Sequence, residues 1–109
     1  MQNGVYCKYK EIQGLMTMRF IWDENKNTIN KEKHGISFEV ASLVFNDPYY
    51  IEMYDFEHSI DEDRYMAIGK VEEILFVVFT ERKESIRLIS ARIATPTERR
   101  LYYDQNSNS

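Results

Sequence analysis

Three arginines near the ends of predicted strands are the side chains best suited to chemistry in this chain. Arg64 precedes one β-rich run, Arg82 ends the next, and Arg92 lies near the end of a third. A guanidinium presents parallel N–H donors that match two phosphate oxygens, so three arginines on a sheet surface form a candidate phosphate site. The alternative is structural: Arg64 and Arg82 would pair with acids at the rim of the sheet, and Arg92 would belong to an ion pair.

A polar segment, "WDENKNTINKEKHG" at residues 22–35, carries the other candidate groups. Its only sizeable interior apolar residue is Ile29, which we expect to seat the segment together with the flanking Trp22 and Ile36. A helix that is polar nearly all round is either weak alone or uses its polar face. His34 offers an imidazole for acid–base catalysis, although a helix C-terminus favours a cation there without any chemistry. The polar face carries Lys26, Asn30, Lys33 and His34.

The totals describe one ordinary soluble domain. The chain has 109 residues, of which 43% are hydrophobic and 29% charged, enough for a single modest core. No apolar run approaches the roughly 20 residues that span a bilayer, and the N-terminal residues lack the unbroken apolar stretch and small-residue cleavage site of a secretory signal. The lone Cys7 suits a reducing compartment, so we expect a cytoplasmic protein.

Several classes of site are not expected. The chain has no phosphate-binding glycine loop and no nucleophile elbow. One cysteine and two histidines argue against a structural zinc site, and we expect neither metal nor cofactor. The net charge of −4 argues against nonspecific nucleic-acid binding over the whole surface. The charge is uneven, however: residues 47–63 hold seven acids and no Lys or Arg, whereas residues 64–103 hold eight bases and five acids.

Apolar patterning predicts the strands that must position these groups. In "SIRLISARI" a period of two places Arg92 on the same face as Leu88, so its guanidinium should be partly buried, paired or functional. The predicted strands are residues 18–22, 49–54, 64–71, 74–82 and 85–93.

Capping residues predict three helices. Asp23 begins a helix that Gly35 ends, and Ser37 begins a second helix that reaches about Phe45. Thr95, followed by a proline at the first helical position and a glutamate three residues on, begins the third. The order βααββββα predicts an α+β domain: an antiparallel sheet of four to five strands, two N-terminal helices and one C-terminal helix, with the helices on one side.

We assign a single domain to residues 18–104. Residues 1–17 lack a clear period and are interpreted as an N-terminal extension whose order the sequence leaves open, and residues 105–109 as a flexible tail.

The segment "FIWDENKNTINKEKHGISFEVA" resembles the opening of the BrnT toxin family. Further pieces follow in the order of that family, and the similarity covers roughly residues 19–103. They are "FNDP", "DRYMAIG", "VVFTER", "IRLISARIAT" and "ERRLYY".

This resemblance implies a RelE-like fold and a metal-independent endoribonuclease toxin of a type II toxin–antitoxin system, which inhibits translation and growth. Its implied partners are RNA and a BrnA-type ribbon-helix-helix antitoxin that neutralises it; operator DNA is contacted only through the antitoxin, and no membrane is involved. The alternative is a non-catalytic, degenerate toxin that binds antitoxin in operon autoregulation. A DNA reader in its own right is disfavoured, because the net charge is negative and no basic recognition helix is present.

The implied chemistry is attack of a 2′-hydroxyl on the neighbouring phosphate. By motif position, Arg64 and Arg92 are the expected phosphate clamps and His34 the expected acid or base. The further RNA-binding candidates are Lys26, Lys33, Arg82 and Tyr102. Tyr102 has the alternative role of packing the C-terminal helix onto the sheet. Because acids repel RNA, we expect residues 47–63 to lie away from the active face.

Overall fold

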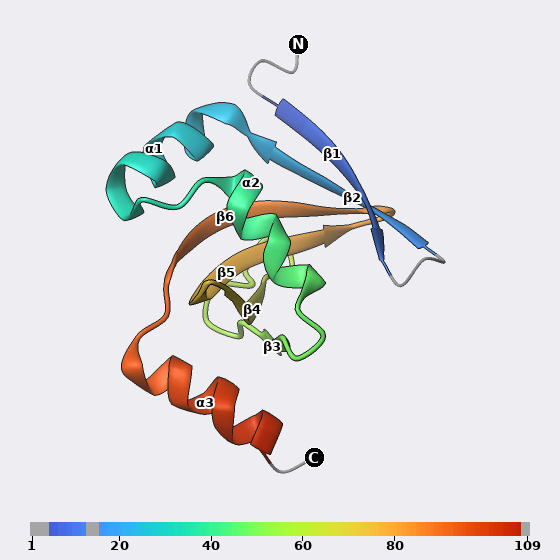
Figure 1. Cartoon of the computed structure of the whole chain (residues 1–109). Helices are drawn as coiled ribbons and strands as arrows, with labels where there is room; N and C mark the ends of the chain where they lie inside the picture. Colours follow the sequence, from blue (N-terminus) through green and yellow to red (C-terminus); the bar gives the residue numbers. More distant parts are fainter. Residues whose placement is uncertain (1–4, 13–15, 108–109) are drawn as a thin grey trace.

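The computed structural model describes residues 5–12 and 16–107 and has an α+β fold (Figure 1). From β2 onward the order is strand, two helices, a short 3₁₀ helix η1, four strands and a helix. The elements are β1 (Val5–Ile12), β2 (Met16–Asp23), α1 (Glu24–His34), α2 (Phe38–Ala41), η1 (Ser42–Asn46), β3 (Ile51–Tyr54), β4 (Tyr65–Val71), β5 (Glu73–Arg82), β6 (Ser85–Ile93) and α3 (Pro96–Ser107).

The six strands form one mixed sheet in the order β1-β2-β6-β5-β4-β3. Neighbouring strands are antiparallel except β2 and β6, which run parallel through Arg19 to Ile21. The prediction of a purely antiparallel sheet of four to five strands was therefore wrong in detail. No hairpin sets the mutual direction of β2 and β6, because two helices and three strands separate them along the chain. The RelE-like assignment stays a prediction.

Both ends of the predicted domain differ from expectation. Residues 5–12, interpreted as part of an extension, form β1 and pair with the whole of β2. At the other end, α3 continues to Ser107, into the predicted tail, and the Asn106 side-chain amide donates to the carbonyls of Tyr49 and Tyr102. The remaining residues of those two segments, 1–4, 13–15 and 108–109, lie outside the described residues.

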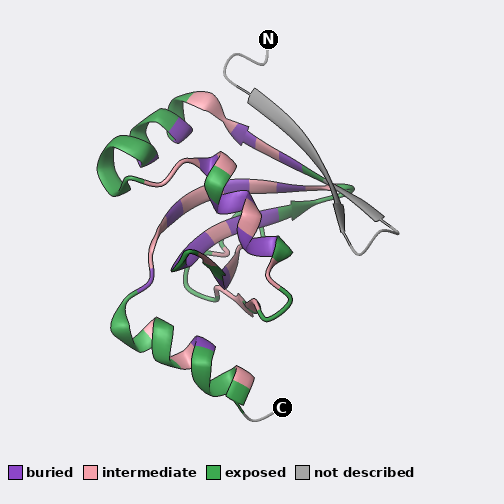
Figure 2. Ribbon diagram, in the orientation of Figure 1, coloured by how far each residue is buried: buried purple, intermediate pink, exposed green. Residues whose placement is uncertain are grey.

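Buried positions lie along the strands of the sheet and on the helices that cover it (Figure 2). They form two apolar clusters, one on each face of the sheet. On the first face, α2 and η1 cover the larger cluster with Phe38, Val44 and Phe45. On the second face, α3 packs Tyr102 against a smaller cluster that includes Ile68 and Phe76. The helices therefore do not lie on one side as predicted. Residues that alternate along β4 and β5 are apolar toward both faces, so each face requires a cover.

A β-bulge in β6 reverses the predicted orientation of Arg92. Val78 pairs with Ser90 whereas Phe79 pairs with Leu88, so Ile89 is an extra residue on β6. An extra residue turns the following side chains to the opposite face. Arg92 therefore lies on the second face and not with Leu88, which belongs to the first cluster.

Two buried asparagines hold α1 against the domain. The Asn30 side-chain amide donates to the carbonyls of Ile36 and Ala91 and accepts from the Ala91 N–H. Asn27 accepts from the Phe38 N–H in the same way. The expectation that Ile29 seats the helix was wrong, since its side chain is 60% exposed. The sequence of α1 is polar nearly throughout because the side chains that dock this helix onto the domain do so through hydrogen bonds.

The predicted caps are confirmed. Asp23 accepts hydrogen bonds from the first turn of α1, and Gly35 ends that helix at a φ of 75°. Ser37 accepts from the Val40 N–H at the start of α2. These contacts are between near neighbours in sequence, which is why the pattern alone identified them.

Candidate active site

A groove of about 570 Å³ lies on the second face, in the part of the sheet next to the loop that joins β3 to β4. It brings together two of the three arginines identified from the sequence, a histidine and an exposed aromatic ring. Its lining is Asp55, Phe56, Glu57, His58, Arg64, Met66, Phe76, Val78, Ile89, Ser90 and Arg92.

Arg92 lines this groove, and contacts within the protein use one face and part of the edge of its guanidinium. Its guanidinium carbon lies 4.2 Å from the centroid of the Phe76 ring. Its Nη1 donates to a Glu98 oxygen at 2.8 Å and to the Ile93 carbonyl at 3.3 Å, and its Nη2 donates to the other Glu98 oxygen at 2.9 Å. Within the described residues these bonds use three of the five N–H donors. The two that remain, on Nε and Nη2, form one fork of the guanidinium and match two phosphate oxygens.

The Arg92–Glu98 pair stays ionised. Hydrogen bonding to Glu98 raises the pKa of Arg92, against the opposing effect of burial. Burial by itself would raise the pKa of Glu98, but the hydrogen bonds from Arg92 and Thr95 outweigh it and hold that pKa below its ordinary value. Glu98 also accepts from the Thr95 N–H, so the predicted capping box is present. Of the two roles that the sequence left open for Arg92, the ion pair is present, and Arg92 also lines the groove. A ligand-facing role stays a prediction.

Arg64 lies at the C-terminal end of the loop that joins β3 to β4. The Asp55 N–H donates to the Arg64 carbonyl at 2.9 Å, and the Ser59 hydroxyl accepts from the Arg64 N–H at 2.8 Å. These bonds hold the backbone of Arg64 at the entry to β4. Among the described side chains no carboxylate pairs with its guanidinium, which leaves that group available to an anionic ligand in the groove.

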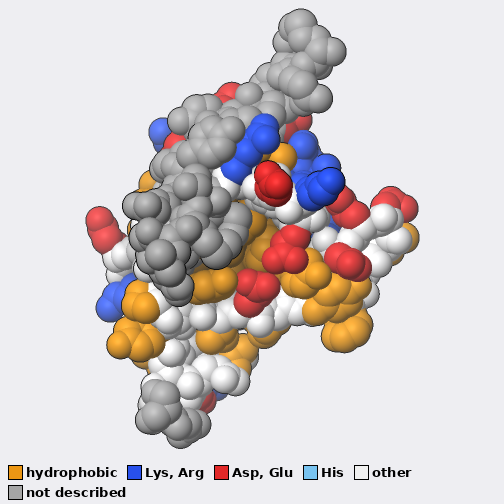
Figure 3. Space-filling model, turned by 90° about the vertical axis from the view of Figure 1, so that its right-hand side faces the viewer, with side chains coloured by type: hydrophobic (Ala, Val, Ile, Leu, Met, Phe, Trp, Pro, Cys, Tyr) orange, Lys and Arg blue, Asp and Glu red, His pale blue; other side chains and the backbone are white. Residues whose placement is uncertain are grey.

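The acidic segment does not avoid the groove, contrary to expectation. Asp55, Glu57 and His58 all belong to residues 47–63 and line it. The backbone hydrogen bond between Asp55 and Arg64 closes the loop and folds this segment over the sheet, together with its acidic side chains. Figure 3 shows a face of the molecule on which acidic side chains likewise lie beside hydrophobic and basic ones.

The loop presents an imidazole next to a carboxylate. His58 Nδ1 lies 2.9 Å from Asp55 Oδ2, and the His58 N–H donates to Asp55 Oδ1 at 3.3 Å. The His58 side chain is 64% exposed and that of Asp55 is 12% exposed. Between them, Phe56 is 84% exposed and meets Tyr54 edge-on, with ring centroids 4.7 Å apart.

The candidates on α1 lie outside this groove. Lys26, Lys33 and His34 are exposed, and none of them is among the groove's lining residues. Asn30, placed on the same polar face from the sequence, is buried against β6 instead. The roles of the three exposed residues in catalysis and RNA binding stay predictions.

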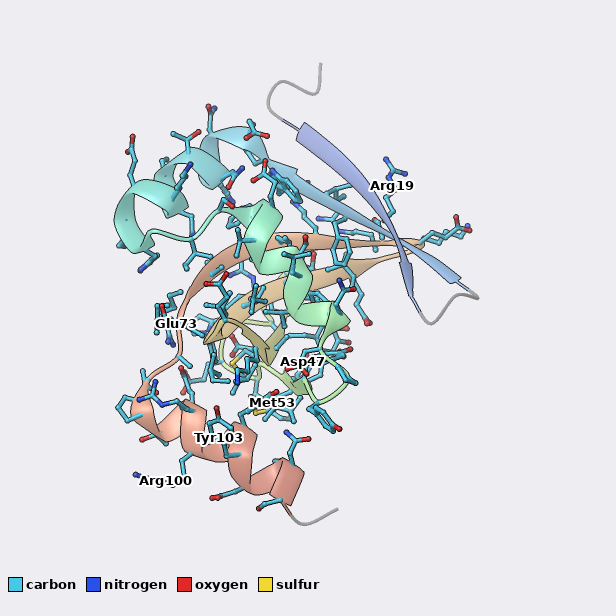
Figure 4. All side chains as sticks on the ribbon, in the orientation of Figure 1. Arg19, Asp47, Met53, Glu73, Arg100 and Tyr103 are labelled. Atoms are coloured by element: carbon cyan, nitrogen blue, oxygen red, sulfur yellow. The ribbon has the colours of Figure 1, made fainter. Side chains whose placement is uncertain are left out.

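Arg82 and Tyr102 also lie elsewhere. Arg82 forms an ion pair with Glu62 at 3.2 Å, which is the structural alternative that the sequence offered. Tyr102 is buried and its hydroxyl donates to Asp47, so it packs α3 onto the sheet. Burial and this hydrogen bond raise the pKa of Tyr102. In Figure 4 Met53 lies toward α3 in the same cluster, whereas Arg100 projects from α3 away from the sheet. An RNA-binding role for Arg82 or Tyr102 stays a prediction.

Sequence reasoning missed Asp55, Phe56 and His58. A signal existed, because a histidine three residues after an aspartate in a turn-rich segment allows a local side-chain contact. It was hidden by the surrounding acids, which made the segment look like a solvated loop. Only closure of the loop onto Arg64 joins these residues to the arginines.

Two further findings concern other kinds of site. Among the described residues, no group of three or more His, Cys, Asp or Glu side chains is arranged to hold a metal ion. Within the same part of the chain, no helix has the length and apolar character needed to cross a membrane.

Comparison with known proteins identifies a family. Comparison with curated proteins gives no match. The family model described as "Ribonuclease toxin, BrnT, of type II toxin-antitoxin system" matches residues 22–98, well over half of the chain. The matched range runs from Trp22, near the end of β2, to the glutamate that holds Arg92 and so includes the whole groove. The chain therefore belongs to the BrnT family of ribonuclease toxins from type II toxin–antitoxin systems.

Proposed function

We propose that this protein is a metal-independent endoribonuclease that cleaves cytoplasmic RNA in the groove on the second face, and so inhibits translation and growth. Membership of the family supports the general activity. The observation that supports the location is the groove itself, where an unpaired Arg64 and the remaining fork of Arg92 line one cavity. Two guanidiniums in one groove suit a phosphodiester, which carries its charge on two non-bridging oxygens.

In this proposal the arginines stabilise charge that develops on the phosphoryl group. The 2′-oxygen attacks the neighbouring phosphorus, the bond from phosphorus to the 5′-oxygen breaks, and the products are a 2′,3′-cyclic phosphate and a 5′-hydroxyl. Donors that are already in place where charge develops contribute about 10²–10³-fold each. The contact with Phe76 and the pair with Glu98 restrict the guanidinium of Arg92 before the substrate arrives.

The groove favours a single-stranded substrate. Phe56 exposes an aromatic face beside the arginines, and an unstacked base can lie on such a ring. Bases in a duplex are stacked on one another and are not available to it. The expected substrate is therefore an unpaired segment of RNA.

The partner follows from the family. A type II toxin–antitoxin system implies a protein antitoxin. We propose a BrnA-type antitoxin with a ribbon-helix-helix part, which neutralises the toxin and makes the contacts to operator DNA. Lys26, Lys33, His34 and Arg82 lie outside the groove and are proposed as further contacts for RNA.

The decisive experiment measures cleavage of single-stranded RNA by the purified protein in the presence of a chelator. We expect cleavage by the wild type, and a loss of about 10²–10³-fold in Arg64→Ala and in Arg92→Ala. Arg64→Ala is the cleaner variant, because its guanidinium has no carboxylate partner among the described residues. The matched control is Arg100→Ala, which removes an exposed arginine that is not among the residues lining the groove and should retain full activity.

The same variants are then expressed in growing cells. Wild type and Arg100→Ala should arrest growth, and Arg64→Ala should not. Intact RNA after prolonged incubation with folded wild type, together with tight binding of antitoxin, would favour the alternative of a non-catalytic antitoxin-binding module.

A further inference from the structure

We infer that Asp55 and His58 form the proton-transfer pair of this ribonuclease, with His58 as the catalytic base and Asp55 as its positioning residue. The inference rests on the proposed function and adds a group that the sequence motifs did not identify.

The contact between the two side chains determines which ring nitrogen is available. A carboxylate only accepts hydrogen bonds, so the nitrogen 2.9 Å from Asp55 Oδ2, His58 Nδ1, carries the proton. In the neutral ring Nε2 is then unprotonated and can accept a proton. Asp55 also stabilises the charged ring that results, as the carboxylate of an Asp–His pair does elsewhere.

Asp55 is held firmly enough to act as a positioning residue. Its side chain is largely buried, and its carboxylate accepts hydrogen bonds from both the ring N–H and the backbone N–H of His58. Its own backbone is tied to the start of β4, because its N–H donates to Arg64 and its carbonyl accepts from the Ser59 hydroxyl. The same hydrogen bonds therefore fix the positions of Asp55 and of the Arg64 backbone relative to each other.

The location separates His58 from the other histidine. Of the chain's two histidines, both of them described, His58 lines the groove with Arg64 and Arg92 and His34 does not. The His58 ring is also exposed enough to meet a substrate that lies against the arginines. A general base must come within hydrogen-bonding reach of the proton that it removes, directly or through one water.

The proposed step is balanced in protons and bonds. His58 Nε2 takes the proton of the 2′-hydroxyl as the 2′-oxygen forms its bond to phosphorus. The bond from phosphorus to the 5′-oxygen breaks, and that oxygen takes a proton from water. The protonated imidazole then returns its proton to the hydroxide so formed, which regenerates water and the neutral ring.

A pH profile is a direct readout of this role. The charged groups that line the groove around His58 are Asp55 and Glu57 on its own loop, Arg64 at the end of that loop and Arg92 from β6. Cleavage that depends on an unprotonated imidazole falls on the acid side of the profile. A substitution that removes the imidazole should remove that acid limb.

The test compares His58→Ala, Asp55→Asn and the matched control Asp61→Asn, each with the intact chain and a single-stranded RNA oligonucleotide. His58→Ala should lower kcat by about 10²–10⁴-fold, leave KM almost unchanged and lose the acid limb. Added imidazole should restore part of its activity, which a merely structural role would not allow. Asp55→Asn should lower kcat with the same KM, because an amide does not stabilise the charged ring. Asp61→Asn, which changes an exposed acid of the same loop outside the lining of the groove, should keep the kcat of the wild type.

The outcomes separate this inference from the proposed function. Wild type that cleaves RNA while His58→Ala keeps its kcat and its acid limb would overturn the inference and leave the ribonuclease intact. Loss of kcat in His34→Ala with no loss in His58→Ala would assign proton transfer to α1 instead. Wild type that cleaves no RNA would overturn the proposed function itself.

Discussion

Arg92 shows how one residue serves a structural and a chemical purpose with different edges of the same group. The fork toward Glu98 and the face over Phe76 are used inside the protein, and the fork formed by Nε and Nη2 remains for a ligand. A lysine at this position would keep one charge but lose this division, because an ammonium has no planar fork. The orientation of the ligand, and not only its attraction, depends on the guanidinium.

Glu98 should make stability depend on pH. Its pKa is lowered in the folded state, so its contribution to stability is fully present above the ordinary carboxyl range and is lost as the pH falls through the lowered pKa. We therefore predict that wild type is more stable than Glu98→Gln at neutral pH and that the difference shrinks below about pH 4. The free energies of unfolding, measured with urea across this range, check it.

Glutamine suits this comparison because it also fits the capping box at the start of α3. The variant thus changes the charge and retains the cap with Thr95. A stability difference that stays constant from neutral to acidic pH would contradict the assignment to ionised Glu98.

At the scale of elements, α1 is a helix docked by hydrogen bonds. Asn30→Ala would leave the Ala91 N–H and C=O and the Ile36 carbonyl without their side-chain partner. Buried groups left in this way cost about 1–3 kcal/mol each, so we predict a loss of several kcal/mol in the free energy of unfolding. Chemical denaturation measures it directly.

The neighbouring position provides the control. Ile29→Ala removes an apolar side chain that is mostly exposed, and surface changes of this kind stay within about 0.5 kcal/mol. If the isoleucine substitution were the more costly of the two, α1 would be docked by apolar contacts after all.

At the scale of the whole molecule, the groove exists because α3 covers only part of the second face. The large cluster lies under α2 and η1 on the first face, and Tyr102 anchors α3 beside the smaller cluster. The rest of the second face is bordered by the β3–β4 loop. The proposed catalytic groups therefore come from a loop and from strand positions that a rigid sheet holds in place.

The acidic net charge limits how RNA binds. In the proposed complex, attraction at the groove comes from its two arginines, and the contacts proposed outside the groove add to it. Single-stranded nucleic acid loses affinity with a log–log slope of about −0.7 per phosphate neutralised, so we predict that the two groove arginines contribute about −1.4 to the slope against salt. Fluorescence anisotropy with an oligonucleotide that lacks the scissile 2′-hydroxyl measures this without cleavage.

Arg64→Ala should make the slope shallower by about 0.7, since one phosphate contact is lost. A much steeper slope, unchanged by that substitution, would place most of the bound RNA on another surface. The exposed lysines of α1 would then be the first candidates.

Local chemistry made several features predictable from the sequence. The strand at residues 85–93, the cap at Asp23 and the capping box at Thr95 depend on residues a few positions apart. Their hydrogen bonds form between neighbours along the chain, so spacing and residue type suffice. The identification of Arg64 and Arg92 as candidate ligands rested on the same kind of reasoning, together with the family motif.

What only the tertiary structure decided involves contacts between distant parts of the chain. The parallel pairing of β2 with β6 and the burial of Asn30 against Ala91 join residues about sixty positions apart. The bulge at Ile89 moved Arg92 to the face where loop closure had placed His58. No local pattern encodes such an arrangement, because a one-residue shift in register changes the face of every later side chain and leaves composition and periodicity almost the same. The sequence by itself thus determined which groups were available, and packing of the sheet decided which of them meet.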